Sequence, residues 1–275
     1  MRFFLFVAII TLISDDYTFG QSYLSEFGAR SKGMANANTT IADEWSIFNN
    51  VAGISEVDDG LVFFGYDKYS GLEGFDKVAA GVIHPFKNGN IGFSLFNFGD
   101  DLYSESSASL AYGNKIGFVR LGAKLSYYQM QIDEFGTAGA LFFDIGGIVE
   151  LIPKLTFGAF ISNFTLSKLQ NAEKSELPVI MKAGFAYHPT DKVNINVDLY
   201  KDIQYSPLIK VGLEYVVVRN LYLRTGVNTN PFKSFFGIGL MLGRFHIDYA
   251  ISNHDLLGFS HQANVSFKYF KRSEL

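Results

Sequence analysis

Val-Asn-Ile-Asn-Val-Asp-Leu-Tyr at positions 193–200 decides the fold of this 275-residue chain. Apolar residues occupy the odd positions from Val193 to Leu199, and polar residues or tyrosine occupy the even positions. A side-chain period of two indicates a β-strand with two different faces. The alternation recurs from about Gly60 to Phe270, with an aromatic-rich apolar set opposite a set that includes ionisable residues. A barrel in a lipid bilayer around a polar interior has this pattern, so we predict an all-β, transmembrane antiparallel β-barrel.

Alternation and turn residues together predict about 14 strands. Connections from odd to even strands, such as 167–177, are longer, whereas those from even to odd strands, such as Arg219-Asn220, are tight. Outer-membrane barrels have this asymmetry, with long outer loops and short periplasmic turns. We therefore expect a Gram-negative outer-membrane location with both barrel termini periplasmic. The expected strands are 60–69, 76–85, 90–98, 105–113, 116–130, 137–150, 154–165, 178–188, 192–201, 206–218, 220–229, 234–242, 244–252 and 259–270.

The first residues predict a secretory signal peptide over residues 1–20. Met1-Arg2 is a short positive head, and the apolar run Phe3–Ile13 is too short to span a bilayer as a helix. Thr18-Phe19-Gly20 offers small residues for cleavage before Gln21. The alternative is an N-terminal anchor helix. Since no later apolar run reaches about 18 residues, the rest of the chain could enter lipid only as a closed barrel.

Composition and motifs exclude several classes of function. The net charge of −4 argues against a broad basic surface for nucleic acid. The absence of cysteine excludes disulfides, thiolate metal sites and cysteine nucleophiles. No nucleotide-binding or zinc-protease motif is present. No serine in a nucleophile-elbow context accompanies the scattered histidines, so we expect no enzyme, catalytic residue, metal or cofactor. The histidines are His84, His188, His246, His254 and His261.

The period of two assigns side chains to the two faces of the wall. Tyrosine and phenylalanine collect toward strand ends on the apolar face, as interfacial aromatic girdles require. The last strand ends on the aromatic Phe270, followed by a short tail, 271–275. The expected lipid-facing residues include Val119, Leu121, Ala123, Leu125, Tyr127, Val179, Met181, Ala183, Phe185, Tyr187, Ile209, Val211, Leu213, Tyr215, Val217, Phe245, Ile247, Tyr249 and Ile251.

The expected lumenal face carries charges of both signs. One interpretation is a solute pathway with a selective field; the other is an ion-pair network that neutralises itself and holds the barrel's shape. A ladder of one sign would favour a pore for charged solutes, so the mixed signs favour the network. Its expected members are Arg120, Lys124, Asp144, Lys182, Asp198, Lys210, Glu214, Arg224, Arg244, His246, Asp248 and Lys268.

Residues 21–57 do not alternate and are predicted to form a hatch before the barrel at 58–270. Thr40 can cap a short helix with acidic residues in its early turns. Trp45 and Phe48 then share one face at i, i+3 spacing. We expect this segment to lie in the lumen or to close the periplasmic mouth. The alternative is a disordered periplasmic leader.

Four pieces of the hatch segment resemble a known family. They are Gly28-Ala29-Arg30, Gly33-Met34, Ala42-Asp43-Glu44-Trp45 and Phe48-Asn49-Asn50-Val51-Ala52-Gly53. They resemble the N-terminal hatch of FadL-like outer-membrane proteins and look closest to the PorV/PorQ family of Bacteroidota. The resemblance implies a 14-stranded barrel with a lumenal hatch and a role in type IX protein secretion. The hatch motif then comprises Gly28, Arg30, Gly33, Met34, Asp43, Trp45, Phe48, Asn50 and Gly53.

Two features depart from the family. Val51 stands where the family usually has proline in Asn-Pro-Ala-Gly, so no proline pins the hatch turn. The chain is also shorter than typical fatty-acid transporters of the superfamily, and its outer loops are short. Long loops build the external substrate groove in those transporters, so these departures weaken a dedicated lipid-uptake role.

Two functions stay open. The first is an accessory subunit of an envelope machine such as the type IX secretion apparatus. The second is a passive channel for hydrophobic solutes such as long-chain fatty acids, which needs an apolar pocket and a lateral opening. A kink of the third strand at Asn97-Phe98-Gly99-Asp100 could supply that opening, although an ordinary strand end is the favoured interpretation. The expected partners are outer-membrane lipid, envelope or secretion proteins and, for the channel, a hydrophobic small molecule.

Overall fold

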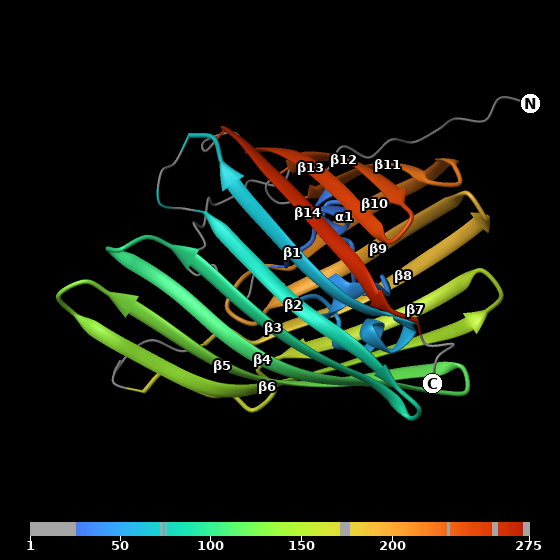
Figure 1. The fold of residues 1–275 in the computed structure, drawn as a ribbon. Helices are drawn as coiled ribbons and strands as arrows, with labels where there is room; N and C mark the ends of the chain where they lie inside the picture. Colours follow the sequence, from blue (N-terminus) through green and yellow to red (C-terminus); the bar gives the residue numbers. More distant parts are fainter. Residues whose placement is uncertain are drawn as a thin grey trace, which may run out of the picture.

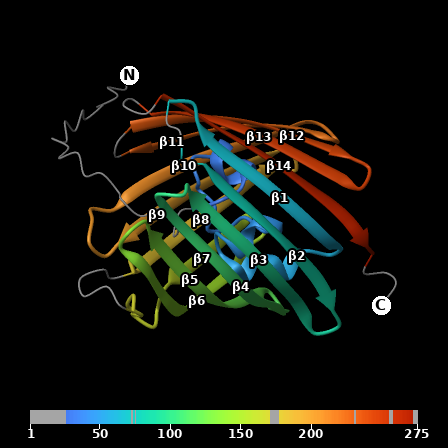
Figure 2. The same ribbon diagram turned by 60° about the vertical axis from the view of Figure 1, so that its left-hand side comes forward.

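The computed structural model describes residues 26–71, 74, 76–170, 177–229, 232–254 and 258–271. The predicted signal peptide lies outside these residues. Antiparallel strands β1 to β14 each pair with their neighbours in the chain, and β1 pairs with β14, so the sheet closes into a barrel (Figures 1 and 2). The strands are β1 Gly60–Tyr69, β2 Lys77–Phe86, β3 Gly89–Gly99, β4 Tyr103–Ile116, β5 Val119–Ile132, β6 Gly136–Ile152, β7 Leu155–Ser162, β8 Ile180–Thr190, β9 Val193–Asp202, β10 Leu208–Val218, β11 Leu221–Thr229, β12 Phe232–Leu242, β13 Phe245–His254 and β14 Gly258–Phe270.

The two ends of the barrel differ in their connections. Gly60 and Phe270 pair at the end where tight turns such as 117–118 join even to odd strands, here called the turn end. The opposite end, here called the loop end, carries the other connections, of which 163–179 is the longest. The predicted closed barrel of 14 strands is confirmed, because a period of two is legible in each strand separately.

Strand β7 is shorter than predicted. It ends at Ser162 rather than at residue 165. The cause lies on the neighbouring strand, where the Asp144 carboxylate accepts hydrogen bonds from Ser162 Oγ at 2.6 Å and Asn163 N at 2.9 Å. Asn163 adopts a φ of 52°, which turns the chain out of the ladder. Residues 136–144 of β6 therefore lie beyond the end of its ladder with β7, which stops at Ile145.

The outward face of the wall is apolar. Leu121, Tyr127, Phe185 and Ile247 are each more than 40% exposed. Such a continuous apolar surface is stable against lipid, as a transmembrane barrel requires. Val179 is an exception and corrects the prediction, because β8 begins only at Ile180 and Val179 is buried. In the described residues, no helix is long and apolar enough to cross a membrane.

The described residues that precede β1, from Glu26 to Val57, lie inside the barrel (Figures 1 and 2). Helix α1 (Ala29–Gly33) packs against β12 and β13, and the 3-10 helix η2 (Val51–Glu56) packs against β4, β5 and β6. Between them lies a second 3-10 helix, η1 (Glu44–Ile47). We call residues 26–57 the hatch.

The predicted helix cap is wrong by three residues. Asp43, not Thr40, caps η1: its Oδ1 accepts from Trp45 N at 3.0 Å, and Ser46 Oγ accepts from Asp43 N at 3.0 Å. This reciprocal capping box satisfies two helix-end N–H groups. Thr40 instead accepts a hydrogen bond from Asn196 of β9 at 3.1 Å, so the barrel wall uses the hydroxyl that the prediction assigned to the cap.

Candidate functional site

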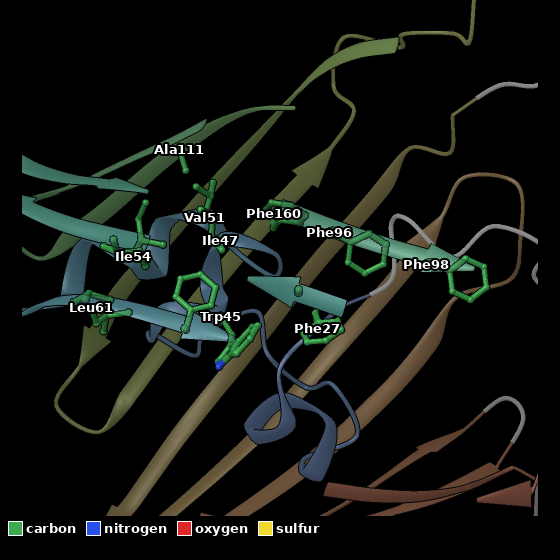
Figure 3. Packing of buried hydrophobic residues seen from close by; sticks show 14 residues of the cluster. Phe27, Trp45, Ile47, Val51, Ile54, Leu61, Phe96, Phe98, Ala111 and Phe160 are labelled. Atoms are coloured by element: carbon green, nitrogen blue, oxygen red, sulfur yellow. The ribbon is translucent and has the colours of Figure 1, made fainter. Parts of the chain in front are cut away.

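An aromatic cluster joins the hatch to the wall. Trp45 stacks with Phe48 at a centroid distance of 6.1 Å and meets Phe63 of β1 edge-on at 4.8 Å. Phe27 lies 5.3 Å from Trp45 and 6.1 Å from Phe96 of β3 (Figure 3). Each such pair contributes about 0.5–1.5 kcal/mol beyond area burial. The lumen at this level is therefore filled by packed side chains.

A ring of inward glycines makes room for the hatch. A Cβ at Gly212 would lie 2.6 Å from Met34, and one at Gly113 would lie 2.6 Å from Ile54. Real Cβ atoms do not approach so closely, so hatch and wall meet without free space. The ring has one member on each of nine strands: Gly65, Gly92, Gly113, Gly122, Gly146, Gly158, Gly212, Gly226 and Gly237. Sequence reasoning missed this ring, although glycine at inward positions of successive strands was a legible signal.

Arg30 links the hatch to a chain of charges on β10, β11 and β13. Its guanidinium donates to both oxygens of Glu214, at 2.9 and 2.7 Å, and lies 3.4 Å from Asp43. Arg224 donates to Glu214 at 2.7 Å and also pairs with Asp248. All four of these partner side chains are at most 10% exposed. Buried charges are tolerated only when paired in this way.

His246 belongs to the same cluster. Its Nε2 lies 3.3 Å from Asp248, and its Nδ1 lies 4.0 Å from Glu44 of the hatch. The pair His246 and Asp248 thus extends the charge network to η1. No cluster of three or more metal-ligating residues occurs in the described part of the chain.

A second anchor holds the first described residue of the hatch. Glu26 lies between two lysines, with Lys182 Nζ at 3.3 Å and Lys210 in direct contact. Lys182 also donates to Asn38 at 3.0 Å. Asp198 accepts two hydrogen bonds from Thr39, from N at 2.7 Å and from Oγ1 at 2.6 Å. Sequence reasoning missed Glu26. This residue precedes the motif, and its ion-pair partners Lys182 and Lys210 lie on strands far along the chain.

Two further ion pairs fix the hatch. Lys32 of α1 pairs with Asp67 of β1 at 2.6 Å and also donates to Ser260. Glu56 at the end of η2 pairs with Arg120 and Lys115, each at 2.7 Å. Burial alone would raise the pKa of Glu56, but these two cations hold it below its ordinary value.

The turn at Val51 forms without proline. Asn50 caps η2 by accepting from Ala52 N at 3.2 Å, and its amide donates to Thr39 O at 2.6 Å and to Gly147 O at 3.3 Å. The side chain of Asn50 therefore holds a turn that has no proline. Gly53 contacts Ser46 and Ile41 so closely that no Cβ fits there.

The other glycines and the methionine of the predicted motif also have places in the packing. Gly28 adopts a φ of 122°, which an L side chain rarely does, and lies against Trp45. Gly33 meets Gly237 of β12. Met34 fills the space over Gly212 and Gly226 and is fully buried.

Four predicted members of the lumenal network have places away from the ion pairs described above. Lys124 and Asp144 pair with each other at 2.9 Å within the wall. Lys268 is about half exposed at the turn end and pairs with Asp59 at 3.1 Å. Arg244 is a correction: it lies exposed in the tight turn before β13, because that strand begins only at Phe245, so it does not face the lumen.

A second apolar cluster lies on the lumenal side of β5 and β6, at the stretch of β6 that has no paired residue on β7. We call it the chamber cluster. It joins inward residues of the two strands to two described leucines of the connection 163–179. Its buried members are Tyr128, Ala138, Ala140, Phe142, Leu169 and Leu177, with Met130 packed against them.

Two backbone hydrogen bonds join the described residues of the connection 163–179 to β6. Phe164 N donates to Phe143 O at 3.1 Å, and Gln170 N donates to Gly139 O at 3.0 Å. By contrast, β3 pairs with β2 as far as Phe98 and with β4 as far as Gly99, without a register shift. The hypothesis of a kink in the third strand is therefore wrong, and Gly99, with a φ of 99°, is an ordinary strand end.

Solved channels have a similar fold. The Pseudomonas putida toluene transporter TodX aligns with a TM-score of 0.66 and 13% identity, over 90% of this chain and 98% of that chain. The Ralstonia pickettii toluene transporter TbuX aligns with a TM-score of 0.67 and 12% identity, over 90% and 99%. A Pseudomonas aeruginosa FadL homologue aligns with a TM-score of 0.65 and 11% identity, over 87% and 97%. No family model matches the sequence, and no curated protein is significantly similar to it. The likeness shows a FadL-like barrel fold.

Proposed function

We propose that the protein is an outer-membrane channel for hydrophobic small molecules. The chamber cluster carries this proposal, because it places buried apolar side chains on the lumenal wall in a group separate from the one that packs against the hatch. The fold likeness to proteins described as a toluene transporter and a monoaromatic hydrocarbon channel supports it. Apolar lining with few polar groups is the usual chemistry of a site for such solutes.

The hatch limits the path that a solute can take through the barrel. Since it fills the lumen toward the turn end, a solute in the chamber cluster has no straight path through the barrel. We propose that solute enters from the loop end and leaves sideways into lipid beside β7. Strand β7 has ended there, and the described residues of the connection 163–179 are held to β6 by two backbone hydrogen bonds, which cost less to open than a strand ladder.

Filling the chamber tests this function. In a bacterial host without other barrels of this type, we expect the wild-type protein to support uptake of radiolabelled toluene or oleate. Ala140→Phe places a ring in the chamber cluster and should reduce uptake severalfold. Leu141→Phe is the matched control, because Leu141 faces outward and is 58% exposed. Equal uptake by both variants would contradict the channel.

A second candidate is the accessory subunit of type IX protein secretion that the hatch motif implies. Its support is the tightly held hatch together with loop-end connections as short as 100–102 and 133–135, which offer no long external funnel. Deletion of the gene separates the two functions. Loss of secreted proteins with normal growth on a hydrophobic carbon source would favour secretion, and the reverse would favour the channel.

The membrane orientation belongs to the same proposal. We place the turn end, with Gly60 and Phe270, on the periplasmic side and the loop end outside. A signal peptide over residues 1–20 would deliver the chain to that membrane. Cleavage before Gln21, measured by mass spectrometry of the mature protein, tests this part directly.

A further inference from the structure

A small groove lies on the outer wall of the barrel near the loop end. It has a volume of about 260 Å³. It spans the neighbouring strands β1, β14 and β13, which lie side by side in Figure 1. Ala263 pairs with a tyrosine on each side, so the hollow forms where a small residue separates two rings. The lining residues are Tyr66, Lys68, Ser70, Tyr249, His261 and Ala263.

The groove marks the border of the apolar band. Toward the turn end, the outward residues of the same strands are apolar, including Val62 and Phe64 on β1 and Phe245 and Ile247 on β13. At the groove the polar residues Lys68, Ser70 and His261 appear on this face, beside the apolar Ile251 and Phe259. This change from apolar to polar side chains is where a membrane lipid changes from acyl chain to headgroup.

Polar side chains accompany the hollow, whose surface is almost wholly apolar. The Tyr249 hydroxyl and Nδ1 of His261 form a hydrogen bond of 2.6 Å. Lys68, which pairs with His261 in the strand register, makes no ion pair with any other described residue, whereas the nearby Tyr66 hydroxyl is held by Asp76. Lys68, His261 and Ser70 thus bring polar groups to the residues that line an apolar hollow.

We propose that this groove binds the phosphate of a membrane lipid, with one acyl chain lying over Ala263 and along the apolar residues below it. A phosphate has several strong acceptor oxygens, which match the donors of Lys68, His261 and Ser70. The proposal rests on the outer wall alone and does not depend on the channel function.

Lipid binding to the purified full-length protein in an uncharged detergent tests the site. The probes are dioleoylphosphatidylglycerol, dioleoylglycerol, which lacks the phosphate, and oleate, and bound lipid is counted by native mass spectrometry. We expect the phosphate lipid to bind most tightly. Lys68→Gln should weaken its binding about tenfold, as for loss of one charge-assisted hydrogen bond. Ala263→Phe should abolish it while leaving every charge in place.

Two controls show whether a loss of lipid binding is specific to the groove. Lys87→Gln removes an exposed charge at the turn end and should bind the phosphate lipid as the wild type does. The melting temperature of each variant shows that the barrel is intact. Unchanged binding in both Lys68→Gln and Ala263→Phe would mean that only non-specific annular lipid is present. Oleate binding as tightly as the phosphate lipid would equally overturn the proposal.

Discussion

Arg30 of the hatch and Glu214 of β10 form a two-pronged ion pair, with Nε–Oε2 at 2.9 Å and Nη2–Oε1 at 2.7 Å. The Glu214 carboxylate also accepts from Arg224 at 2.7 Å, so one wall residue binds two guanidinium groups. This shared carboxylate makes the attachment of the hatch sensitive to a single substitution.

Glu214→Gln should loosen the hatch. Removing one partner of a buried ion pair leaves the other uncompensated, at a cost of about 3–5 kcal/mol. We expect faster cleavage of residues 26–57 by added protease, with the barrel band unchanged on a heat-modifiability gel. Lys268→Gln is the control: its pair with Asp59 is half exposed, and such pairs contribute about 0–1 kcal/mol. Equal protection in both variants would contradict this role of Glu214.

Gly146→Val should displace the hatch, whereas Gly147→Val should not. A Cβ at Gly146 would collide with the Asn50 amide, while one at Gly147 would have its nearest neighbour, a Leu121 methyl, at 3.7 Å. Overpacking of a filled site costs about 1–3 kcal/mol. Protease protection of the hatch measures the difference, and the same loss of protection in both variants would argue against the glycine ring.

Phe185→Arg should block assembly, and Lys182→Gln on the same strand should be tolerated far better. Phe185 is 47% exposed on the lipid face in the middle of β8, and an arginine near the membrane midplane costs about 2–4 kcal/mol. Lys182 faces the lumen, and its partner Glu26 keeps Lys210 when the charge is removed. Folded barrel in outer-membrane fractions is the readout. Comparable yields of the two variants would refute the register of β8.

These features differ in how far the sequence could predict them. The strand number and the two faces follow from a period of two, which each strand shows by itself. The early end of β7 depends on Asp144 of the neighbouring strand, and the exposure of Arg244 depends on where β13 begins. Neither is a local property of the sequence, so the pattern alone could not place them.

The sequence pattern also could not predict the partners of the lumenal charges. The pattern indicated that Lys182, Lys210 and Asp198 face the lumen, but not that they bind Glu26 and Thr39 of the hatch. Those pairs join residues more than 150 positions apart. Mixed charge in the lumen signalled a network, and only the fold shows that the network holds the hatch.

Deletion of residues 26–53 should leave an inserted barrel with raised conductance in planar bilayers. The β1–β14 pairing closes the barrel without help from the hatch, and the lumenal charges would then be hydrated. Conductance equal to that of the wild type would mean that wall side chains alone block the lumen.

A reversible disulfide bond across the barrel wall tests the lateral route most directly. The chain has no cysteine, so Gly139→Cys with Gln170→Cys creates one disulfide, between β6 and the connection 163–179, at residues already joined by a 3.0 Å hydrogen bond. Leu199→Cys with Ile209→Cys is the control, across the intact β9–β10 ladder. If solute leaves through the lateral route, oxidation stops its uptake only in the protein with cysteines at positions 139 and 170, and a reductant restores uptake. Undiminished uptake by the oxidised 139–170 protein would contradict the lateral route.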